Sequence, residues 1–110
     1  MSSTYLAKTA SDRIQLPPAI VEHIRGAAWT EVRVAADEDN ESLTVYPLPH
    51  PNAPQDGFTT ALDATDGLRI SEALRKQVNL DGQSVMVRIE GDVLRIYLRH
   101  VFKTLGFRPN

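Results

Sequence analysis

The hydrophobic and polar positions of this chain follow one pattern twice. The stretch from Asp12 to Ile24 aligns with the stretch from Asp66 to Val78 at a constant offset of 54 positions. Few residues are identical, but the apolar positions coincide, pairing Ile14 with Leu68, Leu16 with Ile70, Ala19 with Ala73, Ile20 with Leu74 and Ile24 with Val78. Agreement of spacing is harder to obtain by chance than agreement of composition. The pattern therefore predicts two copies of one structural unit.

Each copy begins with a pattern that predicts a β-hairpin. A β-prone run covers residues 5–9 in the first copy and 58–62 in the second, and turn-forming residues follow each run. Apolar and polar residues then alternate in Ile14-Gln15-Leu16 and in Leu68-Arg69-Ile70. This alternation is typical of a half-buried strand.

A short helix is predicted after each hairpin. In the first copy Pro17-Pro18 suits a first helical turn, where a missing N–H costs nothing. In the second copy Ser71 is the expected N-cap. The apolar spacing predicts one buried stripe over about two turns. Gly26 and Asn79 are expected to end the helices.

Two further strands close each unit. In the first copy 32–34 and 43–46 flank the acidic run 37–41, which is expected to be a solvated hairpin tip. In the second copy 85–89 and 93–97 flank Glu90-Gly91-Asp92, a tight hairpin signal. Trp29, at the entry to a strand, is expected to pack on the core, with an interface anchor as the alternative.

Two such units are expected to share one core, because a unit of roughly 40 residues cannot bury enough surface alone. Residues 47–54 hold four of the seven prolines and are predicted to be an extended spacer outside the sheet. The predicted fold is mostly β with two short helices, as an intramolecular pseudo-dimer of two ββαββ repeats. Its parts are the repeats 1–47 and 58–98, a linker 48–57 and a basic tail 99–110, in one compact domain.

The order of these elements resembles the swapped-hairpin domain of the AbrB, MazE and MraZ proteins. The second strand of that family resembles Asp12-Arg13-Ile14-Gln15-Leu16-Pro17 here, and its helix resembles Ser71-Glu72-Ala73-Leu74-Arg75-Lys76. The step into its third strand is similar to the segment 80–87. The resemblance implies a swapped-hairpin β-barrel, and both units lie in one chain, as in MraZ.

The resemblance also implies DNA binding and transcriptional regulation. It places the DNA-facing positions at Lys8 and Arg13 in the first copy and at Arg75 and Lys76 in the second, and Arg69 completes the set. The copies are unequal, because the first has Val21-Glu22 where the second has Arg75-Lys76. Specific binders often contact about 6–10 phosphates, so these five cations predict weak binding unless the chain oligomerises or its tail contributes.

Composition narrows the classes of function. Net charge is −2, there is no cysteine, and no apolar run approaches the roughly 20 residues of a membrane helix. We expect a cytoplasmic protein without disulfides. His23, His50 and His100 lack metal-ligand spacing, and no nucleophile motif or phosphate-cradling glycine loop is present. A metal site, a cofactor and enzymatic activity are not expected.

The tail offers a competing function. Every acid lies at or before Asp92, whereas Arg95, Arg99, Lys103 and Arg108 follow it. Apolar residues at 98, 101, 102 and 105 have helical spacing, so the tail is expected to cover one end of the barrel or to bind a partner. The partner-facing candidates are Arg99, Phe102, Lys103 and Phe107. The alternative is a protein-interaction module or a MazE-like antitoxin without strong DNA binding.

Overall fold

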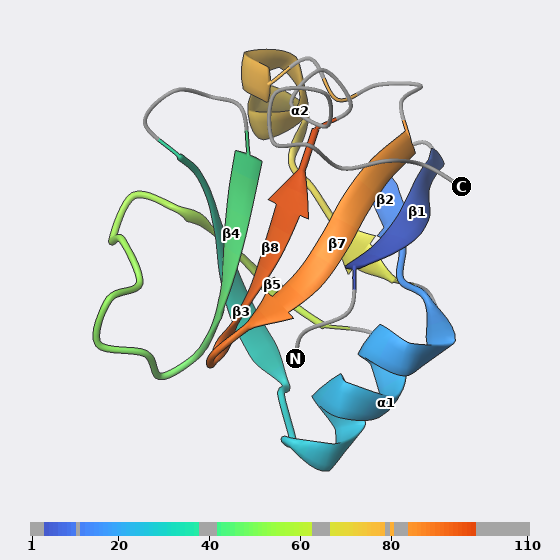
Figure 1. The fold of residues 1–110 in the computed structure, drawn as a ribbon. Helices are drawn as coiled ribbons and strands as arrows, with labels where there is room; N and C mark the ends of the chain where they lie inside the picture. Colours follow the sequence, from blue (N-terminus) through green and yellow to red (C-terminus); the bar gives the residue numbers. More distant parts are fainter. Residues whose placement is uncertain are drawn as a thin grey trace.

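A computed structural model describes residues 4–10, 12–37, 42–62, 67–78, 80 and 84–98. These residues form a single antiparallel sheet that curves into a nearly closed barrel, with a helix at either end (Figure 1). The strand order is β5-β3-β4-β8-β7-β1-β2-β6. The elements are β1 (Thr4–Ala10), β2 (Arg13–Gln15), α1 (Pro18–Gly26), β3 (Glu31–Ala36), β4 (Ser42–Pro47), β5 (Phe58–Ala61), β6 (Leu68–Arg69), α2 (Glu72–Val78), β7 (Ser84–Glu90) and β8 (Val93–Tyr97).

The mostly β architecture with two short helices is confirmed, and so are the predicted helix starts. α1 begins at Pro18 with Pro17 as its N-cap residue. At α2 the Ser71 hydroxyl accepts a hydrogen bond from the backbone N–H of Leu74 at 3.3 Å. This bond satisfies one of the N–H groups that the first turn of a helix leaves without a partner.

α1 ends at Gly26, as the sequence predicts, but this glycine is not the residue that adopts the left-handed conformation. The left-handed position is taken by Ala28, with φ of 58°. The N–H of Ala28 donates to the Arg25 carbonyl and that of Trp29 to the Ile24 carbonyl, both at 3.1 Å. These two bonds form a Schellman motif, in which glycine is the usual left-handed residue. The predicted end of the second helix, Asn79, lies outside the described residues.

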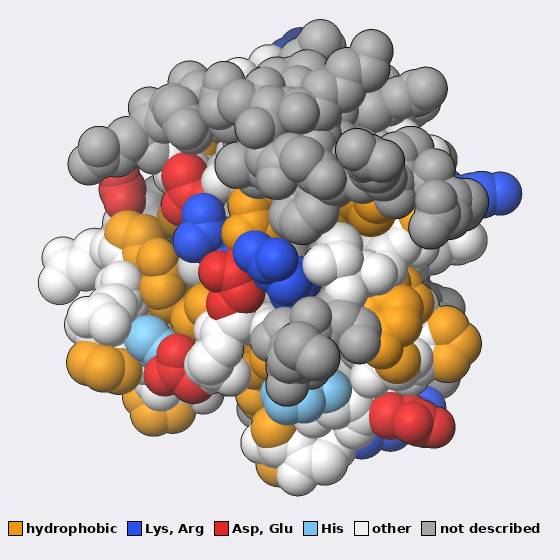
Figure 2. Space-filling view, viewed as in Figure 1, with side chains coloured by type: hydrophobic (Ala, Val, Ile, Leu, Met, Phe, Trp, Pro, Cys, Tyr) orange, Lys and Arg blue, Asp and Glu red, His pale blue; other side chains and the backbone are white. Residues whose placement is uncertain are grey.

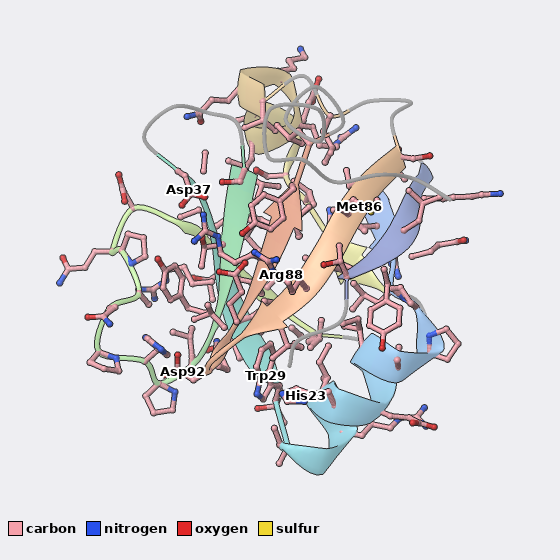
Figure 3. All side chains as sticks on the ribbon, in the orientation of Figure 1. His23, Trp29, Asp37, Met86, Arg88 and Asp92 are labelled. Carbon is pink, nitrogen blue, oxygen red and sulfur yellow. The ribbon has the colours of Figure 1, made fainter. Side chains whose placement is uncertain are left out.

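The core lies inside the barrel, where one face of every long strand points inward. Val32, Val34, Leu43, Val45, Val85, Val87, Leu94 and Ile96 are all fully buried. Ile20 and Ile24 of α1 and Leu74 and Val78 of α2 belong to the same cluster. Trp29 packs against this core, as predicted, with its ring edge-on to His23 at 6.1 Å between ring centroids (Figure 3). The period-two alternation in the strands therefore supplies most of the buried apolar surface.

Strand pairing follows the 54-residue offset found in the sequence. β1 pairs with β7, with Thr4 opposite Arg88, and β5 pairs with β3, with Phe58 opposite Val34. Adding 54 to each β1 number and subtracting 54 from each β7 number converts one register into the other. The first strand of each half therefore pairs with the third strand of the other half.

The proline-rich linker is folded against the sheet, which corrects the expected extended spacer. Pro47 belongs to β4 and lies opposite Val32, and the N–H of Leu48 continues that ladder to the Glu31 carbonyl at 2.8 Å. Pairing of β8 with β4 stops at Val45, so the N–H that Pro47 lacks is not needed there. Beyond it, the linker forms turns between residues 50 and 57.

Candidate nucleic-acid interface

Arg13 of β2 and Arg69 of β6 lie directly opposite each other in the sheet. The next pair along the same two strands is Ile14 with Leu68, and both of these side chains are fully buried in the core. Because side chains alternate between the faces of a strand, the two arginines point to the outer face. Their side chains are 42% and 63% exposed. Two cations that are far apart in sequence thus meet on the barrel surface.

Asp12 carries the carboxylate that serves both arginines. Its Oδ2 lies 3.3 Å from Nε of Arg69, and its Oδ1 lies 3.9 Å from Nε of Arg13. Its backbone carbonyl accepts a hydrogen bond from the N–H of Ile70 at 2.8 Å, which ties the turn before β2 to the end of β6. Like charges placed directly opposite each other destabilise a sheet, and this carboxylate offsets part of their repulsion.

Two further cations, Arg75 and Lys76, lie in the last turn of α2, the helix that follows β6. Nε of Arg75 donates a hydrogen bond to the backbone carbonyl of Ile70 at 3.2 Å. This bond holds the partly buried guanidinium group against the residue that follows Arg69 in the chain. Lys76 forms an exposed ion pair with Glu72 at 3.0 Å, one helical turn earlier. Such i, i+4 pairs contribute about 0.3–0.5 kcal/mol and are screened by salt. Lys76 is therefore available to an anionic partner at small cost.

Lys8 lies on the same outer face, one strand further along. It is exposed and stands opposite Gln15 in the pairing of β1 with β2. Gln15 and Arg13 are two residues apart on β2 and so share a face. Lys8, Arg13 and Arg69 therefore lie on the same outer face of the sheet. The hydrogen bond to the Ile70 carbonyl places Arg75 beside them. Lys76 sits on α2 without a described contact to the other four.

The imbalance between the two copies has a steric cause at one position. Gly67 is equivalent to Arg13 at the 54-residue offset, has φ of 92° and approaches the backbone of Ile14 and Gln15. A Cβ atom there would overlap the Ile14 carbonyl oxygen. Only glycine fits such a close approach at positive φ. The second copy therefore cannot present an arginine at this position, and the arginine pair takes one member from each half at non-equivalent positions.

A second charged cluster on the outer face was not foreseen from the sequence. We call Asp37, Arg88, Glu90, Arg95 and Tyr97 the Glu90 cluster. Positive and negative groups alternate across it, over β7, β8 and β4 (Figure 2). Arg88 donates to Glu90 at 2.6 Å and Arg95 to Asp37 at 3.0 Å. Both guanidinium groups lie over the Tyr97 ring, 5.1 and 5.6 Å from its centroid.

Asp37 corrects the expectation of a solvated acidic tip. It is partly buried and accepts hydrogen bonds from the hydroxyl groups of Ser42 and Thr44 on β4. The other residues of that run, 38–41, lie outside the described residues. The signal available in the sequence was the outward Arg95 on a strand that pairs with β4, but finding it requires the register of two distant strands.

Ionisation within the Glu90 cluster is shifted. Burial alone raises the pKa of Glu90, but hydrogen bonds from Tyr97 and Arg88 and the nearby positive charges outweigh it, so the pKa of Glu90 is lowered. Burial, together with the hydrogen bond to Glu90 and its charge, raises the pKa of Tyr97. The hydrogen bond to Glu90 raises the pKa of Arg88. The two carboxylates neutralise both arginines, so this cluster is a structural network and a poor anion site.

The other candidate residues of the sequence lie in the C-terminal tail. Arg99, Phe102, Lys103 and Phe107 of the tail lie outside the described residues, and so does His100. Within the described ranges, no group of three or more histidine, aspartate or glutamate side chains is arranged to hold a metal ion. Neither described helix is long and apolar enough to cross a membrane.

Comparison with protein-family models and with curated protein sequences finds no match.

Proposed function

We propose that this protein is an AbrB-like DNA-binding protein that regulates transcription, built as a swapped-hairpin pseudo-dimer of two ββαββ repeats. The outer face of β1, β2 and β6 and the basic last turn of α2 contact the phosphate backbone. The observation that supports this proposal most directly is Arg13 opposite Arg69, with Arg75 held at the end of β6. The exchange of first strands between the halves supports the swapped arrangement.

The charges of this face set the expected strength of binding. Five cations lie on or beside it, and Asp12 and Glu72 are paired with three of them. Each neutralised phosphate contributes about −0.9 to the slope of log K against log salt, so five contacts give a slope of about −4.5. We therefore expect weak, strongly salt-dependent binding to random duplex by a single chain. Tighter binding requires oligomerisation or the basic tail.

A mobility-shift assay with random-sequence duplex at low salt, together with retention on heparin, tests the proposal. Arg69→Gln removes one member of the arginine pair and should weaken binding several-fold. Arg25→Gln, on exposed α1 at the other end of the sheet, changes net charge equally and should have a much smaller effect. Arg75→Glu combined with Lys76→Glu should abolish the shift. No shift well above about 10 µM, with no salt-sensitive retention, would exclude DNA binding in this form.

The carboxylates among the cations favour one second candidate, a protein-interaction module related to MazE-like antitoxins. Asp12 and Glu72 lower the net positive charge of the face, and Gly67 excludes a second arginine. A family member that had lost DNA contacts would show these features. Such a protein would bind no duplex DNA. Neither Arg69→Gln nor the double variant Arg75→Glu with Lys76→Glu would alter its retention on heparin.

A further inference from the structure

We infer that Asp12 is a built-in competitor of the anionic ligand, which restricts the Arg13–Arg69 pair to polyanions. The inference rests on the proposed function and assigns to one acidic residue the selectivity of that site. Asp12 is the neighbour of Arg13 in sequence and reaches Arg69 across the β2–β6 pairing. One carboxylate therefore lies within 4 Å of both cations that are offered to a phosphate.

The contacts of the Asp12 carboxylate with Arg69 and Arg13 are long enough for another anion to displace it. The closer of them joins Oδ2 of Asp12 to Nε of Arg69 at 3.3 Å, and the other is 3.9 Å long. The Asp12 side chain is 38% exposed, so water screens its charge. Exposed ion pairs of this kind are weak, and a stronger ligand can replace the carboxylate without leaving a buried charge unpaired.

Covalent tethering makes Asp12 effective against small ligands but not against duplex DNA. A tethered group has a high effective concentration at its partner, of the order of millimolar or above. A free carboxylate or a single phosphate must compete with that concentration on its own. A duplex presents about one charge per 1.7 Å of axis, engages several cations together and releases condensed counterions. The same carboxylate that excludes isolated anions is thus overcome by a polyanion.

The test compares Asp12→Asn with Glu22→Gln. Both variants remove one negative charge, but Glu22 is exposed on α1, at the opposite end of the sheet from α2. At about 50 mM salt we expect Asp12→Asn to lower the dissociation constant for random duplex roughly fivefold, and Glu22→Gln to change it less than twofold. Asparagine is close in shape to aspartate and leaves the backbone bond from Ile70 in place.

Titration with inorganic phosphate, followed through the arginine Nε–H signals by NMR, separates this inference from the proposed function. Millimolar phosphate should shift the Arg13 and Arg69 signals in Asp12→Asn and leave them unchanged in the parent chain and in Glu22→Gln. If no chain binds duplex but phosphate shifts both signals in Asp12→Asn alone, the DNA-binding proposal fails and the competitor role stands.

Three results would overturn the inference. Weaker duplex binding by Asp12→Asn would show that Asp12 positions the arginines for their ligand. Equal gains in Asp12→Asn and Glu22→Gln would reduce the effect to net charge. Phosphate that leaves Arg13 and Arg69 unshifted in Asp12→Asn would remove the claimed exclusion of single anions.

Discussion

Ile14 and Leu68, 54 positions apart in the sequence, lie directly opposite each other in the pairing of β2 with β6, and both are fully buried. The offset that relates the two halves therefore places equivalent residues face to face. This pair also orients the arginines, because Arg13 and Arg69 are the next residues on the outer side of the same two strands. Packing of the core and presentation of the charged face thus depend on one register.

Truncating this pair should destabilise the whole domain. Leu68→Ala leaves a cavity in a core that both halves share, and such changes cost about 2–5 kcal/mol of unfolding free energy. Leu6→Ala is the control, because Leu6 is 55% exposed on β1 and its loss should cost less than about 0.5 kcal/mol. Urea denaturation followed by circular dichroism measures both. Equal, small losses would contradict a common core at β2 and β6.

The end of α1 should tolerate, and benefit from, a glycine. Ala28 has φ of 58°, a conformation that costs an L-residue about 1–2 kcal/mol and that glycine adopts freely. Since glycine also loses more entropy on folding, Ala28→Gly should stabilise the protein by about 0.5–1 kcal/mol.

Ala27→Gly provides the matched control for that substitution. Ala27 precedes Ala28 and has an ordinary right-handed conformation, with φ of −88°. Glycine relieves nothing there, so Ala27→Gly should be neutral or destabilising. Thermal unfolding of the two variants distinguishes them. A melting temperature raised equally by both, or by neither, would mean that the Schellman motif of α1 carries no strain at Ala28.

The Glu90 cluster predicts a loss of stability in acid. The pKa of Glu90 is lowered in the folded protein, so as pH falls the unfolded chain takes up this proton first, at about pH 4.3. The stabilisation is complete above that pH and is lost as pH falls through the folded-state pKa. Denaturation of the parent chain and of Glu90→Gln should therefore differ most near pH 6 and converge towards pH 3. A difference independent of pH would contradict this account.

Tyr97 should control that acid response through its hydroxyl group. Tyr97→Phe keeps the ring that both guanidinium groups contact but removes the hydrogen bond to Glu90, so the pKa of Glu90 should rise towards its ordinary value. The expected cost is about 1–3 kcal/mol, as for a hydrogen bond to a charged group. Tyr46→Phe, outside the cluster, should leave Glu90 unchanged. An NMR titration of the Glu90 carboxyl carbon reads both outcomes.

Local patterns predicted most of the elements, and contacts between distant residues account for what they missed. Period-two alternation predicts β2 and β6, and Ser71 is recognisable as an N-cap from its place before an apolar stripe. Asp37 looked like one of several solvated acids, because its partner Arg95 is 58 residues away and meets it only through the pairing of β4 with β8.

The arginine pair also combines residues that the sequence identifies with a contact that it does not. Arg13 and Arg69 were both candidates, but their juxtaposition requires the register of β2 on β6, which no local pattern specifies. The role of Asp12 was hidden for the same reason: beside Arg13 it is an ordinary turn residue, and its contact with Arg69 appears only across the strands. The sequence therefore predicts which arginines are candidates, whereas their contact with each other and with Asp12 follows only from the register of β2 on β6.

The fold of the linker gives a final prediction, on the tautomer of one histidine. The His50 side chain is only 6% exposed, its ring lies 5.2 Å from that of Tyr46, and its Nδ1 accepts a hydrogen bond from the backbone N–H of Asn52 at 3.1 Å. A nitrogen that accepts carries no proton, so the proton must reside on Nε2, which lies 2.8 Å from Oδ2 of Asp92. The linker is thereby joined to the turn between β7 and β8.

Long-range ¹⁵N–¹H correlation spectra at about pH 8 should show His50 as the pure Nε2–H tautomer, whereas the exposed His23 serves as the internal comparison. Asp92→Ala removes the acceptor and should cost about 1 kcal/mol, because the buried Nε2–H loses its partner. It should also speed exchange of the Asn52 amide proton as the turn loosens. An Nδ1–H tautomer, or unchanged exchange at Asn52 in Asp92→Ala, would show that His50 does not fasten the linker.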